Sequence, residues 1–161
     1  MGGAYRATGL YRLTHVNGRA AQLFGCSFLA LGPATPALAD CAGGDGQLTG
    51  PGSSCSTPQT LGGSSLAGTV GSGWTLSTGS SDAYTVAGSG DSLLNQGTIT
   101  STASDQTVNI SGAGGSLSNQ GLIENSGTGA GVVVTNASSG ALDNAAGGTI
   151  TTGGDGIEAT G

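Results

Sequence analysis

Two stretches of the sequence, Ser92–Ile99 (SLLNQGTI) and Ser116–Ile123 (SLSNQGLI), follow one pattern. A third copy starts at Ala141–Asn144 (ALDN) and, after a two-residue insertion, ends at Gly148–Ile150 (GTI). The pattern is a small residue, Leu, any residue, Asn, any residue, Gly, any residue and Ile. Self-similarity at a fixed period, here about 24 residues, is the signature of a repeat architecture. The positions that carry it are Leu93, Asn95, Ile99, Leu117, Asn119, Ile123, Leu142, Asn144 and Ile150.

A second apolar series keeps the same period. Its members are Tyr84–Val86 (YTV), Val108–Ile110 (VNI) and Val132–Val134 (VVV), which are evenly spaced. Asp155–Ile157 (DGI) resembles the start of a further copy, and Trp74–Leu76 (WTL) resembles a degenerate first one. Two independent series with one period indicate a structural repeat rather than a coincidence of composition.

The repeat predicts a β-solenoid. Short alternating runs are typical of strands, and the Gly/Ser clusters between them are typical of turns. A unit of about 24 residues cannot enclose its own hydrophobic centre, so copies must stack and share a core. We therefore expect an all-β fold of three to four coils, in which each strand pairs in parallel with its equivalent one coil away. For Asn95, Asn119 and Asn144, two interpretations remain open: a stacked amide ladder or local Asn-x-Gly turn chemistry.

Charge is distributed very unevenly along the chain. The formal charge is −6, but all three arginines and the only histidine lie within residues 1–19, and all nine acids lie from Asp40 onward. A segment without cations cannot neutralise nucleic-acid phosphates or dock on anionic lipid through a basic patch. Without histidine or lysine, most acid–base and nucleophilic constellations are also excluded. Gly and Ser enrichment, few aromatic residues and uniform negative charge are compatible with disorder, but sparse charge and the regular spacing of apolar residues favour the solenoid.

Residues 1–39 are typical of a secretory signal peptide. A region with three arginines and no acid precedes the apolar run Leu23–Leu31, and Ala37-Leu38-Ala39 supplies small residues for cleavage between Ala39 and Asp40. A membrane anchor is the weaker interpretation because a spanning helix needs about 20 apolar residues. A lipoprotein signal ending at Cys26 would leave almost no apolar core ahead of the cysteine. We expect export.

Cleavage after Ala39 would leave two cysteines, Cys41 and Cys55, in the mature chain. An even pair in an exported chain predicts a disulfide, and closing a loop of this size contributes about 3 kcal/mol in the chain-entropy model. A metal pair lacks further ligands. The expected organisation is a signal peptide at 1–39, a loosely ordered Gly/Ser/Thr-rich leader at 40–70, and incomplete β-helix repeats at 71–161 that continue beyond the chain.

The signal ending Pro36-Ala37-Leu38-Ala39, the Leu-x-Asn-x-Gly-x-Ile repeats and the Gly/Ser/Thr-rich body resemble the passenger domains of bacterial autotransporters. The resemblance covers the signal and residues 84–161, and its motifs are degenerate. It implies a right-handed parallel β-helix carried to the surface of a Gram-negative cell by a C-terminal β-barrel in the outer membrane. The barrel is an expected export partner that this sequence does not itself contain, because it has no series of alternating strands of roughly ten residues.

The sequence suggests two functions. The first is a structural or adhesive surface rod with weak, multivalent contacts to glycans or proteins of a host or neighbouring cell; this requires no enzyme activity, cofactor, catalytic residue or metal ligand. The alternative is a fragment of a secreted polysaccharide-active β-helix enzyme, for which Asp105, Asp143 and Asp155 would have to converge. Solvated turn carboxylates are the simpler interpretation of these three. Single GGDG segments, such as Gly153–Gly156, are weak calcium motifs, and Trp74 and Tyr84 suggest a structural cap more than a sugar platform.

Overall fold

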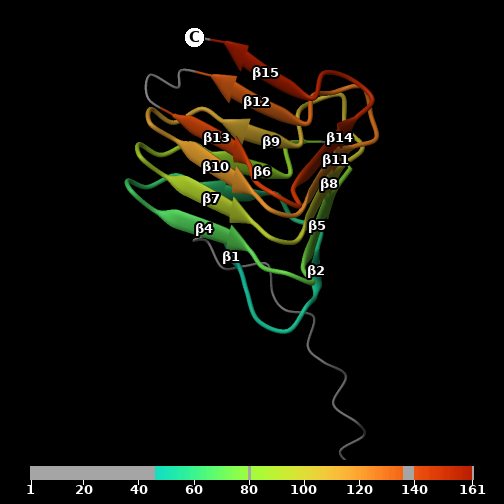
Figure 1. The fold of residues 1–161 in the computed structure, drawn as a ribbon, viewed down its shortest axis with the longest axis horizontal. Helices are drawn as coiled ribbons and strands as arrows, with labels where there is room; N and C mark the ends of the chain where they lie inside the picture. The colour runs from blue at the N-terminus through green and yellow to red at the C-terminus, as the bar shows by residue number, and fades with distance from the viewer. Residues whose placement is uncertain (1–45, 80, 136–139, 161) are drawn as a thin grey trace, which may run out of the picture. The chain divides into compact units, whose positions relative to one another are not determined.

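The computed structural model describes residues 46–79, 81–135 and 140–160, and these form a β-solenoid (Figure 1). Their fifteen strands make three parallel sheets of five strands each. Sheet A contains β1 (Gln47–Leu48), β4 (Ala67–Val70), β7 (Ser92–Asn95), β10 (Ser116–Asn119) and β13 (Ala141–Asn144). Sheet B contains β2 (Ser54–Cys55), β5 (Thr75–Thr78), β8 (Thr98–Ser101), β11 (Leu122–Asn125) and β14 (Thr149–Thr152). Sheet C contains β3 (Gln59–Leu61), β6 (Tyr84–Val86), β9 (Val108–Ile110), β12 (Val132–Thr135) and β15 (Ile157–Thr160).

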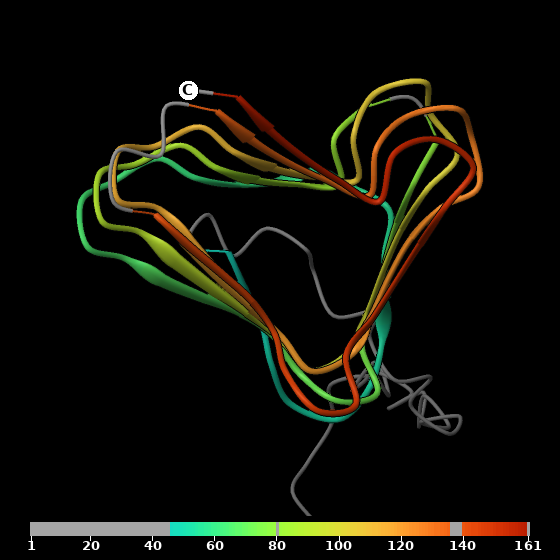
Figure 2. The same ribbon diagram turned by 45° about the horizontal axis from the view of Figure 1, so that its top comes forward.

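Each coil contributes one strand to sheets A, B and C in turn, so that coil 1 is β1–β3 and coil 5 is β13–β15. In Figure 2 the chain runs counterclockwise as it rises toward the viewer from the green coil to the red one, which is the sense of a right-handed helix. The predicted parallel β-helix is therefore confirmed. The described part of the chain contains no α-helix, and thus none that is long and apolar enough to cross a membrane.

The solenoid has five coils rather than the three to four that we expected, because it begins earlier than residue 71. The segment 40–70 was predicted to be a loosely ordered leader, and this is wrong for its described part, where β1, β2, β3 and β4 lie. Leu48, Cys55 and Leu61 are buried in coil 1 without following the Leu-x-Asn pattern. Trp74–Leu76 was expected to open the repeats, and it instead belongs to the second coil, with Leu76 paired to Cys55 below and Ile99 above.

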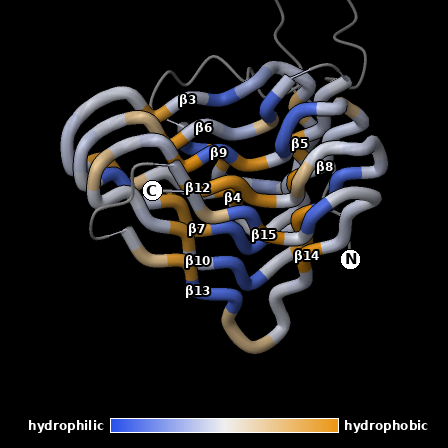
Figure 3. Tube along the Cα trace, turned by 90° about the horizontal axis from the view of Figure 1, so that it is seen from above, coloured by the Kyte–Doolittle hydropathy of each residue, from blue (hydrophilic) through white to orange (hydrophobic). Residues whose placement is uncertain are grey.

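The pairing register is the one that the repeat predicts. Asn95 pairs with Asn119, and Asn119 with Asn144; in sheet B, Ile123 lies between Ile99 and Ile150. Because side chains alternate between the faces of a strand, matched positions form inward columns that run along the stack. In Figure 3, hydrophobic and hydrophilic stretches of β7, β10 and β13 lie in corresponding places along the three strands.

The core consists of these aliphatic columns. Leu93 and Leu117 in sheet A, Ile99 and Ile123 in sheet B, and Val108 in sheet C are at most 2% exposed. Coil 5 repeats the columns but forms the last strand of each sheet, so Leu142 and Ile150 are only partly buried. Ile157 is 48% exposed although its partner Val132 is fully buried.

Both aromatic side chains of this region are structural. Tyr84 is fully buried in sheet C and reaches across the core, where its hydroxyl donates to the Gly46 carbonyl oxygen at 2.8 Å. A Cβ at Gly46 would lie 2.1 Å from that hydroxyl oxygen and one at Gly68 would lie 2.0 Å from it, so both positions require glycine. Trp74 is 3% exposed at the turn between sheets A and B of coil 2. These burials support the structural interpretation over a sugar-stacking platform, although the two residues lie in coil 2 and not in the first.

Candidate functional site

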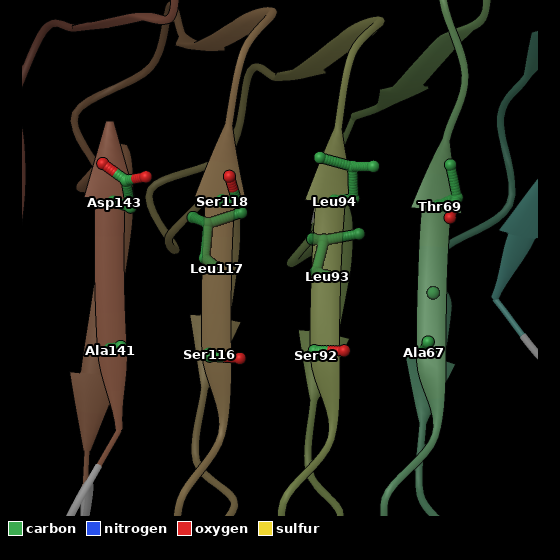
Figure 4. Close-up of a pocket in the computed structure, with 11 residues that line it drawn as sticks. Ala67, Thr69, Ser92, Leu93, Leu94, Ser116, Leu117, Ser118, Ala141 and Asp143 are labelled. Atoms are coloured by element: carbon green, nitrogen blue, oxygen red, sulfur yellow. The ribbon is translucent and has the colours of Figure 1, made fainter. Parts of the chain in front are cut away.

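The outer face of sheet A carries the candidate binding site, a groove of about 430 Å³ that crosses β4, β7, β10 and β13. Figure 4 shows two rows of side chains, each with one residue per coil, and Leu93 and Leu117 between the rows. The strand register aligns the rows: each residue pairs with its counterpart in the next coil. One row is Ala67, Ser92, Ser116 and Ala141, and the other is Thr69, Leu94, Ser118 and Asp143.

The groove follows from small side chains on a flat sheet. Adjacent parallel strands lie about 4.8 Å apart, so the four strands span roughly 14 Å along the solenoid axis. Alanine, serine and threonine leave the strand backbone close to the surface, and only Leu94 stands higher in the middle. Thr69, Ser92, Ser116 and Ser118 offer hydroxyl groups that donate and accept hydrogen bonds, and Asp143 supplies a carboxylate at one end. This chemistry suits an uncharged or cationic polar ligand that lies along the axis.

The asparagines of the repeat are internal and are not part of this groove. Asn95 Nδ2 donates to Asn119 Oδ1 at 2.8 Å, and Asn119 Nδ2 donates to Asn144 Oδ1 at 2.7 Å. Asn95 Oδ1 also accepts from the Gly97 N–H at 3.2 Å. The two interpretations that the sequence left open therefore both hold at Asn95: its Nδ2 belongs to a ladder and its Oδ1 closes an Asn-x-Gly turn.

A second polar column was missed in the sequence. Thr78, Ser101, Asn125 and Thr152 end the sheet B strands, and each bonds to the turn that leads into sheet C. Asn125 Nδ2 donates to the Asp105 carbonyl oxygen at 2.7 Å, and Thr152 Oγ1 donates to that of Gly129 at 2.7 Å. The spacing of these four residues is close to the period of the repeat, so the sequence contained evidence of the column. Because the residue type changes from coil to coil, pattern matching did not detect it.

The three candidate carboxylates are distributed over different parts of the fold. Asp143 lies in β13 on the outside of sheet A, whereas Asp105 and Asp155 lie in turns between sheets B and C, in coils 3 and 5. Sheet A and those turns are different sides of the coil, so Asp143 does not converge with the other two. Within the described ranges, no group of three His, Cys, Asp or Glu residues is placed to hold a metal ion. This includes the Gly153–Gly156 segment.

Of the two predicted disulfide cysteines, Cys55 lies in β2 and is disulfide-bonded. Cys41 precedes the described residues, as do the predicted signal peptide and its cleavage site between Ala39 and Asp40. The pairing of Cys41 with Cys55 and the export signal stay predictions.

One buried carboxylate was not anticipated. Asp91 is fully buried where sheet C leads into sheet A, and its Oδ1 accepts from the Leu66 N–H at 2.8 Å. Its Oδ2 is buried with no hydrogen-bond partner among the described residues. A Cβ on Gly88 would lie 2.1 Å from Oδ2 and 2.2 Å from the Gly63 carbonyl oxygen, so two acceptors flank the same point. The corner thus holds a carboxylate without a counter-charge, in a chain that has no cation after Arg19.

Substitution of Asp91 by Asn and by Ala should change stability in opposite directions. Asp91→Asn keeps an oxygen for Leu66 and removes the buried charge, so we expect the free energy of unfolding to rise by about 1 kcal/mol. Asp91→Ala leaves the Leu66 N–H without its acceptor, so we expect a loss of about 1–2 kcal/mol. Urea unfolding at neutral pH measures both. Equal destabilisation by the two variants would show that the carboxylate itself is required.

No family model, curated protein or solved structure matches the chain in the comparisons with known proteins, so the assignment of function depends on the geometry above.

Proposed function

We propose that the protein is an exported β-solenoid of a Gram-negative cell surface, the passenger segment of an autotransporter-like outer-membrane protein, which displays a contact surface for adhesion. The observation that carries this proposal is the groove on sheet A. It repeats one row of small and hydroxyl side chains in every coil from β4 to β13, so it offers equivalent contacts at regular intervals rather than one catalytic centre.

Charge supports the same function. Among the described residues there are seven acids, namely Asp82, Asp91, Asp105, Glu124, Asp143, Asp155 and Glu158, and no Lys, Arg or His. Apart from Asp91 these are at least partly exposed. Such a surface repels nucleic acid and anionic lipid. Weak contacts repeated along a rigid rod gain strength through multivalency when the partner is also repetitive, which is the case for glycans and protein layers on a cell surface.

The groove is tested by paired substitutions in one coil. Ser92 lies in the groove, and Thr98 holds the corresponding outward position of β8 in sheet B of the same coil. Ser92→Arg places a long charged side chain in the groove, and Thr98→Arg adds the same charge on another face. We expect Ser92→Arg to reduce adhesion of protein-coated beads to cells or to immobilised glycans and proteins at least tenfold, because the bulk blocks several contacts at once.

Thr98→Arg is expected to leave adhesion within about twofold of the wild type, and both variants should unfold at the same urea concentration. Equal adhesion of the two variants would show that the contact surface does not lie on sheet A. Export is tested separately, by expressing the full chain in a Gram-negative host and determining the N-terminus of the exported product. A protein retained in the cytoplasm with segment 1–39 still attached would overturn the localisation.

A further inference from the structure

Cys55 is a core residue of coil 1 and not a surface cysteine. It is 3% exposed and lies in the sheet B column that continues with Leu76 and Ile99. It is also disulfide-bonded. The chain has three cysteines, and the other two, Cys26 and Cys41, both precede the described residues. Within one chain, the bond therefore joins the core of coil 1 to a residue on its N-terminal side.

Coil 1 is held by fewer interactions than the coils above it. Its strands have two, two and three residues, against three or four in every later strand. Each of them is an edge strand, at the opposite edge of its sheet from coil 5, so coil 1 pairs only with coil 2. The backbone bonds across this junction include Gly71 N–H to Leu48 O at 2.8 Å, Thr75 N–H to Ser53 O at 2.9 Å and Ala87 N–H to Leu61 O at 2.8 Å.

The disulfide does not cross this junction, but it restricts the chain of coil 1 when coil 1 opens. If the second half is Cys41, as the sequence predicts, the closed loop runs from Cys41 to Cys55 and contains all of β1. Restricting a loop of this size contributes about 3 kcal/mol, which corresponds to roughly a hundredfold change in an opening equilibrium. Elements at the end of a fold open locally at a small cost in free energy, so a change of this size alters how often coil 1 opens. The central coils are paired on both sides and open less readily.

We propose that the Cys55 disulfide is a redox latch for coil 1. With the disulfide formed, the solenoid has five coils. With two thiols, coil 1 detaches from coil 2 while coils 2–5 stay folded. The detachment uncovers Val70 and Tyr84, which are fully buried and pair with coil 1. For a chain exported as proposed above, coil 1 would thus close only after the protein leaves a reducing compartment.

The chemistry of latching is thiol–disulfide exchange with an oxidised dithiol protein or a small disulfide. One thiolate of the chain attacks a sulfur of the oxidant and releases one oxidant thiol. The second thiolate then attacks the mixed disulfide, which forms the intramolecular S–S bond and releases the second oxidant thiol. The two cysteine protons and two electrons therefore end on the oxidant, and reduction by a dithiol reverses both steps.

Hydrogen exchange of the full chain, read by mass spectrometry with and without a phosphine reductant, tests the latch. We expect the amides of Gly71, Thr75 and Ala87 to lose protection by roughly a hundredfold on reduction. The matched control is the junction between coils 3 and 4, where Gln120 N–H donates to Asn95 O and Leu122 N–H to Gly97 O. Protection there should change less than twofold. This readout does not depend on export or adhesion.

Cysteine variants separate the latch from an effect of the reductant. Cys41→Ser leaves Cys55 in the core, and we expect it to exchange like the reduced wild type with or without reductant. Cys26→Ser should keep the full response to reductant. Unchanged protection of coil 1 after reduction of the wild type would overturn the proposal, as would an equal loss of protection in all five coils. A response abolished by Cys26→Ser alone would support the latch and assign its second half to Cys26.

Discussion

Substitution of Gly121 by Ala is expected to lower the free energy of unfolding by about 3 kcal/mol. A Cβ at this position would lie 2.1 Å from the Gly97 carbonyl oxygen, which belongs to the backbone one coil below. Neither side of this contact is a flexible side chain that can move away. The two coils must separate locally, and the neighbouring bond from Leu122 N–H to Gly97 O, 2.9 Å long, would be strained.

The same contact recurs along the stack and explains the glycine of the repeat. A Cβ at Gly97 would lie 2.5 Å from the Gly71 carbonyl oxygen, and one at Gly148 would lie 2.2 Å from that of Asn119. Glycine at this turn is thus required by the close approach of successive coils. The glycine of the Leu-x-Asn-x-Gly-x-Ile pattern therefore recurs once per coil because each coil must pack closely on the one below it.

Gly156→Ala is the matched control, because a Cβ there meets nothing within 4 Å. Alanine restricts the unfolded chain, so this variant should be about 0.5 kcal/mol more stable than the wild type. Urea unfolding followed by far-ultraviolet circular dichroism measures both variants. The packing account fails if Gly121→Ala is as stable as Gly156→Ala.

The second large effect is expected for Asn119→Leu, at about 3 kcal/mol of lost stability. Asn119 is fully buried in the middle of the ladder, where it accepts from Asn95 and donates to Asn144 and to the Thr149 carbonyl oxygen. Leucine has a similar volume, so the cost comes from three groups that lose a partner: the buried Asn95 amide, and the oxygens of Asn144 and Thr149, which belong to exposed residues. Each such loss costs about 1–3 kcal/mol. Asn95 Nδ2 also donates to the Leu122 carbonyl oxygen. The expected loss of stability is therefore about 3 kcal/mol, at the lower end of the sum of three such losses.

Asn144→Leu serves as the comparison because Asn144 is exposed at the last coil, and the Asn119 Nδ2 group that it leaves still donates to the Thr149 carbonyl oxygen. It should cost less than about 1 kcal/mol. The double variant Asn95→Leu/Asn119→Leu should cost less than the sum of the two single variants, since the pair removes donor and acceptor together. In coils 1 and 2, the position that corresponds to Asn95 is occupied by the apolar residues Leu48 and Val70. Strict additivity in the double-mutant cycle would contradict a coupled ladder.

The repeat made most of the fold predictable. The pairs Leu93 with Leu117 and Val108 with Val132 follow from a shared spacing, and the structure confirms them. Coil 1 escaped detection because its buried Leu48, Cys55 and Leu61 do not share residue types with later copies. The groove was not predicted, since the sequence shows Ser92 and Ser116 as the first residues of the repeat pattern, but only the sheet aligns them on one outer face.

The sequence by itself determined the period, the residues that face inward and the exclusion of a basic binding surface. These are consequences of side-chain alternation and of composition, which need no knowledge of neighbours in space. Only the tertiary structure decided where the first coil begins, which side of the solenoid is hollowed, and that Asp91 and Cys55 are buried. Each of these features depends on contacts with the neighbouring coil, which is a full repeat away along the chain. Neighbouring coils must fit one another in shape and in hydrogen bonding, and different residue types can meet that requirement.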